Sequence, residues 1–163
     1  MVYVGIDVAK DKHDCFIANS DGEVLYDVFT IQNNMDGFED LLFKIKTASR
    51  DLSKVKVGLE ATGHYSCNIL GFLHNKGLTT IVINPLHTNA YRKSLSLRKT
   101  KTDKADARAI ASMIMSDVSL KPYSDTVYHN EDLQSLSRYS FDKVPDRSKL
   151  NQSVSRLVNI LFP

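Results

Sequence analysis

The sequence predicts an α/β protein with a mixed five-stranded sheet, flanking helices and a C-terminal helical extension. The chain opens on an almost unbroken apolar run, Val2–Val8, which is typical of a strand buried on both faces. Two more strand patterns follow directly, and a helix–strand–helix–strand succession comes after them. Because parallel strands need crossover connections, the first three strands can pair antiparallel and the last two must run parallel. The length of 163 residues fits one domain, or one domain with an appendage.

The second and third strands are predicted over residues 13–19 and 23–31. Between them, Asp21-Gly22 supplies the left-handed backbone that a tight reversal needs. The chain therefore begins as a three-stranded antiparallel meander.

A helix and a fourth strand come next. Asn33-Asn34 offers an N-cap, and the helix is predicted to run to about Ala48. Its apolar residues recur at helical spacing: Phe38, Leu41, Leu42 and Ile45. The fourth strand covers residues 55–61 and carries the carboxylate Glu60 near its end.

A second helix is predicted to end at Gly77, before a fifth strand at Thr79–Ile83. This order of elements is that of the ribonuclease H-like fold. A dinucleotide-binding Rossmann domain fits less well, because no GxGxxG follows the first strand and the early hairpin is out of place.

Two more helices are predicted, at residues 85–97 and from Asp103 to about Met115, the second with Thr102 as its N-cap. Its packing face consists of Ala107, Ile110, Ala111 and Ile114. Pro122 and the residues after it break the helical pattern. We therefore expect a first domain at residues 1–122 and a helical segment at 123–163.

The helical segment is predicted from Glu131 onward, with Pro145 kinking or interrupting it. An apolar seam then recurs at heptad-like steps: Leu150, Val154, Leu157 and Leu161. Such a seam needs a partner helix, for which we expect another copy of the protein or further C-terminal sequence.

Positive charge is concentrated in one window. The formal net charge is only +2, yet residues 91–108 hold seven bases and two acids. This density suits a polyanion such as nucleic acid, although a solvated charged loop is an equal alternative on charge alone. The candidate nucleic-acid-binding residues are Arg92, Lys93, Arg98, Lys99, Lys101 and Lys104.

The two cysteines, Cys15 and Cys67, lie in a predicted strand and a predicted helix and have no metal-ligand spacing. We expect both to be buried thiols rather than a disulfide. No apolar run is long enough to span a membrane and no secretory signal is apparent, so we expect a cytoplasmic protein.

Four acids form the candidate site. Asp7 interrupts the apolar first strand, and a buried carboxylate is costly unless it is paired, hydrogen-bonded or bound to a metal. In a ribonuclease H-like sheet the fourth strand lies beside the first, so Asp7 and Glu60 would be neighbours. Asp103 and Asp106 share one helix face at i, i+3. Four converging carboxylates need cations, and Mg²⁺ (or Mn²⁺) is the natural choice for chemistry on phosphodiesters.

Each acid also has a purely structural alternative. The alternatives are Asp7 or Glu60 as turn or helix caps, Asp103 as a complement to the helix dipole, and Asp106 as the ion-pair partner of Lys104 or Arg108. The joint placement of the acids at strand ends, beside a basic stretch, favours the metal interpretation.

Four sequence blocks carry these acids or lie between them: Gly5-Ile6-Asp7-Val8-Ala9-Lys10, Leu59-Glu60-Ala61-Thr62-Gly63-His64-Tyr65, Asn84-Pro85 and Lys101-Thr102-Asp103-Lys104-Ala105-Asp106-Ala107. Together they resemble the motif series of the DEDD insertion-sequence transposases, a family that includes the Piv-type DNA invertases and the bridge-RNA-guided recombinases. The resemblance covers the N-terminal RuvC-like domain and extends to the closing stretch, residues 150–163.

The resemblance implies that Asp7, Glu60, Asp103 and Asp106 are the four metal-binding acids and that DNA is the partner. Family members combine a RuvC-like domain, a coiled-coil segment that aids oligomerisation, and a C-terminal domain with a serine nucleophile. None of the serines here matches that nucleophile, so we expect this chain to bind metal and nucleic acid but to recombine DNA poorly or not at all by itself. The resemblance leaves open the use of a guide (bridge) RNA and implies residence in a prokaryotic cytoplasm, at the nucleoid.

Three other interpretations remain open. A stand-alone resolvase or nuclease of the same fold would need no serine domain, and a truncated regulator would bind nucleic acid without catalysis. An actin-like or sugar-kinase half also begins with a strand ending in Asp, but glycine-rich phosphate loops are absent. Further candidates for nucleic-acid contact, with ordinary packing as the alternative, are His64, Tyr65, His87 and Tyr91.

Overall fold

Five strands form a single mixed sheet in the order β3-β2-β1-β4-β5. The strands are β1 (Val2–Val8), β2 (Lys12–Asn19), β3 (Val24–Gln32), β4 (Val55–Glu60) and β5 (Thr79–Ile83). The first three pair antiparallel, whereas β4 runs parallel to both β1 and β5. The predicted sheet, with the first strand at its centre, is confirmed.

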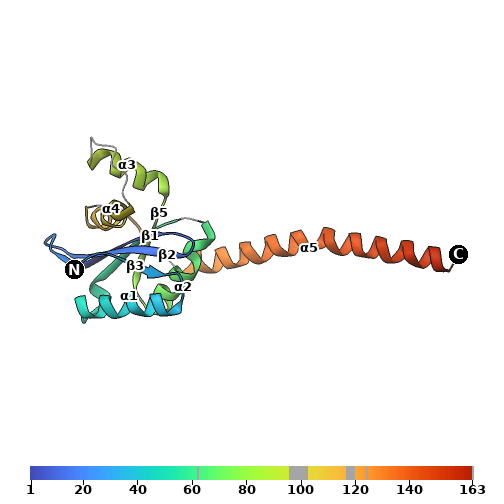
Figure 1. Cartoon of the computed structure of the whole chain (residues 1–163), viewed down its shortest axis with the longest axis horizontal. Coiled ribbons are helices and arrows are strands. Elements are labelled where there is room, and N and C mark those ends of the chain that lie inside the picture. The colour runs from blue at the N-terminus through green and yellow to red at the C-terminus, as the bar shows by residue number, and fades with distance from the viewer. Residues whose placement is uncertain (62, 96–102, 117–119, 124, 163) are drawn as a thin grey trace. The chain divides into compact units, whose positions relative to one another are not determined.

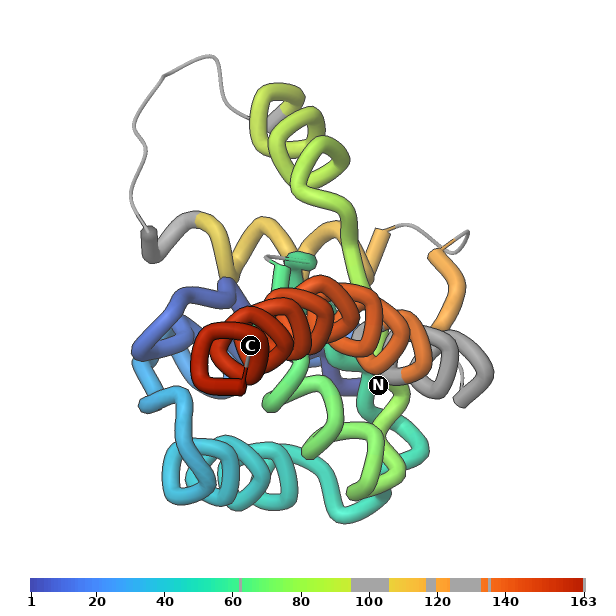
Figure 2. The backbone as a smooth tube through the Cα atoms, turned by 90° about the vertical axis from the view of Figure 1, so that its right-hand side faces the viewer, coloured from blue at the N-terminus to red at the C-terminus, as the bar shows by residue number. Residues whose placement is uncertain are grey.

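The computed structural model describes the backbone of residues 1–61, 63–95, 103–116, 120–123 and 125–162, and the side chains in these ranges except those of 95, 103–105, 125–132 and 135. The helices are α1 (Met35–Ala48), α2 (Cys67–Asn75), α3 (Pro85–Leu95), α4 (Asp103–Ser116) and α5 (Asp125–Leu161), with short 3₁₀ turns η1 (Leu52–Lys54) and η2 (Gly63–Ser66). Figures 1 and 2 show α1 and α2 on one face of the sheet and α3 and α4 on the other. The predicted N-cap Thr102 lies outside the described residues.

Contacts divide the chain into two units, Met1–Tyr123 and Ser124–Pro163. Tyr123 belongs to the first unit because its backbone N–H donates to the Thr80 carbonyl of β5, at 2.7 Å.

Strand alternation separates two cores. One face of β1 joins the larger core with α1 and α2, through Val2, Val4, Ile6 and Val8. The other face carries Tyr3 and Gly5 toward α4. The predicted packing face of α4 is confirmed, since Ala107, Ile110, Ala111 and Ile114 are all buried.

The approach of α4 to the sheet depends on two glycines. Gly5 and Gly58 are register partners on the adjacent strands β1 and β4. A Cβ at Gly5 would lie 2.7 Å from the Ala111 nitrogen and closer still to the Ala107 carbonyl oxygen. A Cβ at Gly58 would meet only side-chain atoms, the nearest being Ile114 Cγ2 at 2.8 Å. The backbone of α4 therefore lies directly on β1.

The hairpin between β2 and β3 differs from the prediction in one respect. Gly22 has φ +82°, but Asp21 does not share the left-handed conformation, since among the described residues only glycines have positive φ. The Asn19 side-chain oxygen accepts hydrogen bonds from the backbone N–H groups of Asp21 and Glu23, at 3.0 and 2.9 Å. These two bonds hold the turn, so one left-handed residue is enough to reverse the chain.

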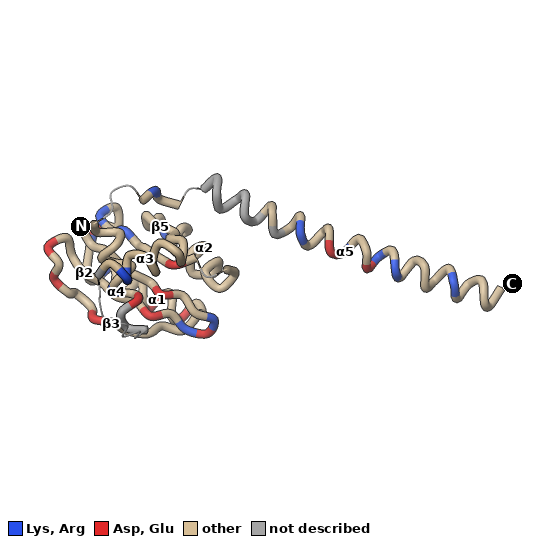
Figure 3. Tube along the Cα trace, turned by 90° about the horizontal axis from the view of Figure 1, so that it is seen from above, with Lys and Arg blue, Asp and Glu red and all other residues tan. Residues whose placement is uncertain are grey.

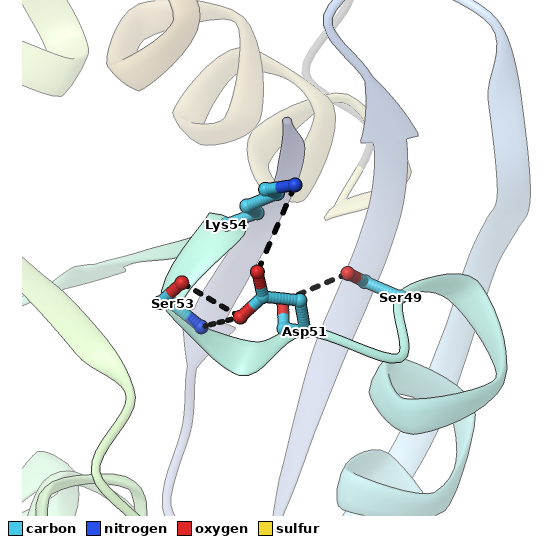
Figure 4. A network of polar contacts seen from close by, with 4 residues as sticks. All are labelled: Ser49, Asp51, Ser53 and Lys54. Carbon is cyan, nitrogen blue, oxygen red and sulfur yellow. Dashed lines mark hydrogen bonds and ion pairs between the residues drawn. The ribbon is translucent and has the colours of Figure 1, made fainter.

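The entry to β4 is fixed by Asp51, whose side chain caps η1 (Figure 4). Its Oδ1 accepts from the backbone N–H and the hydroxyl of Ser53, at 3.0 and 2.6 Å, and these bonds lower the pKa of the Asp51 carboxyl. The Ser49 hydroxyl donates to the Asp51 carbonyl at 2.9 Å. This network sets where β4 begins and hence where its last residue, Glu60, lies.

One sequence expectation is wrong, and one of the two effects expected of Pro145 is not found. Cys15 is buried as expected, but Cys67 is exposed, because it is the first residue of α2 and the apolar side of that helix begins at Ile69. Pro145 does not interrupt α5, which is assigned as helix throughout. Proline removes one backbone hydrogen bond, and at this exposed position water can satisfy the freed carbonyl.

The helix α5 exposes its apolar seam. Leu150, Val154, Leu157 and Leu161 are each more than half exposed within this unit, and the charged residues of its described part are spread along its length (Figure 3). None of the described helices is long and apolar enough to span a membrane.

The glycine pair generates a prediction. Gly5→Ala places a methyl group against the α4 backbone, which cannot yield as a side chain can, so we expect a loss of about 3 kcal/mol in the free energy of unfolding. Gly58→Ala, the matched control, meets isoleucine side chains, which can shift more readily than helix backbone, and should cost less, about 1 kcal/mol. Urea unfolding followed by circular dichroism measures both values, and a Gly5→Ala protein as stable as Gly58→Ala would contradict this account.

Candidate functional site

Asp7 and Glu60 come together at the ends of two adjacent parallel strands. The register pairs Ile6 of β1 with Leu59 of β4, so Asp7 and Glu60 are the next residues along each strand. Ile6 and Leu59 belong to the core on the α1 side, and side chains alternate along a strand. Asp7 and Glu60 therefore point to the α4 side of the sheet.

Asp106 reaches the same side from α4. It precedes Ala107, the residue whose carbonyl lies against Gly5, so the close docking of the helix fixes its height above the sheet. Its buried carboxylate forms an ion pair with Arg92 of α3. Lys104 and Arg108 are the possible ion-pair partners of Asp106 that the sequence indicates. Arg108 is not that partner, because it pairs with Asp27.

The remaining predicted acid is Asp103, the first residue of α4, whose side chain lies outside the described part of the chain. Three of the four predicted acids therefore have described side chains, and the three come from separate elements to one side of the sheet.

The charges of these acids are coupled. The pKa of Asp7 is raised to about 6, mainly by burial and then by the neighbouring carboxylates Asp106, Glu60 and Asp14, while Arg92 opposes the rise. Burial also raises the pKa of Glu60, with Arg92 lowering it and Asp106 raising it. Negative charge is thus gathered here beyond what one arginine offsets.

The chemistry of the donor set fits a hard divalent cation, which prefers carboxylate oxygens. The arrangement of these side chains in the described part of the structure, however, does not form a metal site. Among the side chains that the structure describes, no group of three or more His, Cys, Asp or Glu is placed to hold a metal ion. The cation that Asp106 does contact is the guanidinium of Arg92.

One acid near the site was missed by the sequence analysis. Asp14 of β2 is the register partner of Asp7 and accepts a hydrogen bond from the Thr30 hydroxyl at 2.6 Å. On its own, an acid in a meander strand indicates only a solvent-facing position. Pairing the two strands across their short turn would have placed Asp14 opposite Asp7.

The turn that follows Asp7 is held by His13 rather than by Asp7 itself. The Ala9 backbone N–H donates to His13 Nδ1 at 3.3 Å, which leaves the proton of the neutral ring on Nε2. The ring is fully buried and stacks on Phe38 with centroids 6.1 Å apart, and burial lowers its pKa. The interpretation of Asp7 as the cap of this turn therefore loses its main support.

The predicted nucleic-acid-binding bases are only partly described. Arg92 lies in the acidic cluster and Lys93 is exposed on α3. Lys104 lies in α4 with its side chain outside the described part, and Arg98, Lys99 and Lys101 lie outside the described residues altogether.

The two histidines and two tyrosines proposed for nucleic-acid contact differ in exposure. His64 and His87 are exposed, whereas Tyr65 packs on the larger core and Tyr91 packs beside α4. For the two tyrosines the structure favours the packing alternative.

The strand order of the sheet and its helices on both faces are those of the ribonuclease H-like class, and solved structures of this class have a similar fold. Thermus thermophilus RuvC in complex with a Holliday junction substrate aligns with a TM-score of 0.53 at 14% identity, over 76% of this chain and 99% of that one. A further T. thermophilus RuvC structure gives the same TM-score and identity. These similarities confirm the predicted RuvC-like fold.

The chain belongs to the IS110-type DEDD transposase family, whose model, described as "Transposase", matches residues 4–163. The pilin gene-inverting protein of Moraxella bovis is 37% identical over 110 residues, which are 67% of this chain and 33% of that protein. An uncharacterised protein of insertion element IS116 from Streptomyces clavuligerus is 26% identical over 160 residues, 98% of this chain and 38% of its own length. The match thus spans only 33% to 38% of the length of these curated relatives.

The raised pKa of Asp7 generates a prediction for stability. A carboxyl whose pKa is higher in the folded protein stabilises it fully below its ordinary value of 3.8 and loses that contribution as pH rises through about 6. Without metal, Asp7→Asn should therefore raise the free energy of unfolding at pH 7.5 by about 1 kcal/mol, after allowance for partial exposure, and leave it unchanged near pH 4.

Urea unfolding in EDTA at the two pH values checks this expectation, with Asp21→Asn in the exposed hairpin turn as the matched control. An Asp7→Asn protein that is less stable at both pH values would show that the carboxylate is a structural cap.

Proposed function

We propose that this chain is the RuvC-like portion of a DEDD transposase or site-specific DNA recombinase. Residues 1–122 are the catalytic domain and residues 123–163 the helical segment, and a serine nucleophile comes from a separate C-terminal domain. The single observation that carries the proposal is the gathering of Asp7, Glu60 and Asp106, from three elements, on one side of the sheet. Family membership and the RuvC-like fold support it.

In this proposal Asp7, Glu60, Asp103 and Asp106 hold Mg²⁺ or Mn²⁺, which supplies activation of the attacking oxygen and stabilisation of the leaving oxygen of a DNA phosphodiester. The carboxylates orient the site because two of them end rigid strands and one lies on a helix docked by its backbone. The predicted bases beside the acids, with Lys93 exposed on α3, hold the phosphate backbone.

A stand-alone resolvase is the second candidate. The observation that favours it is the alignment with 99% of a RuvC chain whose structure holds a Holliday junction substrate. The two functions differ in one requirement, since a resolvase would cleave branched DNA without any serine-bearing domain.

The metal prediction can be tested on the purified chain. Titration with Mn²⁺ by calorimetry should give binding that Asp7→Asn, Glu60→Gln or Asp106→Asn each weakens at least about tenfold, because each removes a charged ligand. Asp142→Asn, in the exposed part of α5, is the matched control and should leave the affinity unchanged. Equal affinity in all variants would place the metal elsewhere and remove the catalytic assignment.

DNA assays separate the two candidates. We expect the purified chain to bind DNA in a salt-dependent way and to show no strand exchange by itself. Strand exchange by the unaided chain would refute the need for a serine domain. Metal-dependent cleavage of branched DNA, lost in Asp7→Asn, would favour the resolvase.

We propose in addition that α5 forms a homo-oligomer through its apolar seam. The helix is 37 residues long, roughly 55 Å, and a seam of this kind is stable in water only against another helix. Leu150→Glu combined with Leu157→Glu should convert the chain to a monomer in light scattering coupled to size-exclusion chromatography. Gln152→Glu adds a charge at another exposed position of α5 and is the control, and an oligomer that survives the double substitution would contradict the proposal.

A further inference from the structure

Arg92 lies where the acidic cluster needs a cation. Its guanidinium forms an ion pair with Asp106, and the two side chains are only 22% and 12% exposed. It also donates to the Asn89 side-chain oxygen at 2.7 Å, which holds the arginine from its own helix. Its charge opposes the rise in the pKa of both Asp7 and Glu60. The charge of Arg92 therefore acts on Asp7 and Glu60 as well as on its direct partner Asp106.

The same arginine ties α3 to α4. Thr88 of α3 is fully buried, and the Tyr91 hydroxyl lies 3.3 Å from Ser116 Oγ at the end of α4. Arg92 reaches Asp106 near the start of that helix. Tyr91 and Arg92, which are neighbours on α3, thus contact opposite ends of α4. Of these two contacts, the one between Arg92 and Asp106 is an ion pair.

A guanidinium and a divalent cation beside one carboxylate repel each other, and the repulsion is stronger in a partly buried site than in water. Asp106 cannot serve both fully. We propose that Arg92 is the internal counter-ion of the metal-free site, and that a divalent cation held by Asp7, Glu60 and Asp106 competes with it for Asp106. This inference rests on the proposed function and adds a positioning residue to it.

A consequence follows for nucleic acid. When metal loads the site, Arg92 is released from Asp106 on a helix that already exposes Lys93. The freed guanidinium can then pair with a backbone phosphate, for which its planar donor geometry is suited. Coupling between two binding events is reciprocal. If the Arg92–Asp106 contact weakens metal binding by a given factor, bound metal must weaken that contact, and with it the attachment of α3, by the same factor.

The first test compares Mn²⁺ affinity by calorimetry in the whole chain and its variants. Arg92→Gln should bind Mn²⁺ about tenfold more tightly than the unmodified chain. Arg108→Gln removes the same charge and also breaks an Arg–Asp ion pair, but one with the exposed Asp27, and should change the affinity by less than about twofold. If Arg92→Gln fails to fold, Arg92→Lys replaces it; the gain in affinity should then be smaller, because lysine keeps the positive charge and loses only the forked hydrogen bonding.

Loss of a nearby positive charge alone could tighten metal binding, so a second readout is needed. Amide hydrogen exchange of α3, residues 86–95, should become about tenfold faster in the unmodified chain when saturating Mg²⁺ is added. In Arg92→Gln the exchange should be fast from the start and insensitive to Mg²⁺.

Four outcomes would overturn the inference. Equal Mn²⁺ affinity in Arg92→Gln and the unmodified chain, or α3 exchange that ignores Mg²⁺ in both, would refute competition while leaving the acids as a metal site. Weaker binding in Arg92→Gln would show that Arg92 supports the bound metal. Absence of Mn²⁺ binding in every variant would remove the proposed function, and the inference with it.

Discussion

The candidate site depends on how closely one helix approaches the sheet. Gly5 and Gly58 lie side by side on the two central parallel strands and leave a shallow channel without side chains. The alanines of α4 fit this channel, so the helix backbone contacts β1 and not a layer of side chains. Because rigid backbone atoms meet on both sides, the helix has little freedom to slide, and Asp106 is held at a fixed position above Asp7.

The two faces of the sheet carry different tasks. On the α1 and α2 side, large apolar side chains such as Leu41, Ile45 and Leu73 fill a broad core that supplies most of the apolar burial. On the α4 side the contact residues are small, and three carboxylates take up space that apolar groups would otherwise fill. Gathering carboxylates on the α4 side destabilises the fold. The domain tolerates this because the large apolar core on the α1 and α2 side supplies most of its stability.

Much of the fold could be predicted from the sequence. The apolar run of β1, the meander and the crossover helices fixed the sheet order, and the spacing from Ala107 to Ile114 identified the packing face of α4. The errors share one cause, which is local inference without tertiary context. Proline in an exposed helix did not end it, and a cysteine at the start of α2 was not on its buried side.

The site was less predictable than the fold. Strand order places Asp7 beside Glu60, and the docking of Ala107 on Gly5 places Asp106 on the same side of the sheet, so the shared location of these three acids could be inferred from topology. The ion pair of Arg92 did not follow, because an arginine in a basic window indicates only a contact with a polyanion. Asp14 was missed because its relation to Asp7 exists only across the strand pair. What a single sequence conceals is therefore the charge balance among side chains from different elements. Among the described side chains, that balance is between three carboxylates on one side of the sheet and Arg92, which forms an ion pair with Asp106, and in our proposal it governs whether a metal ion can bind.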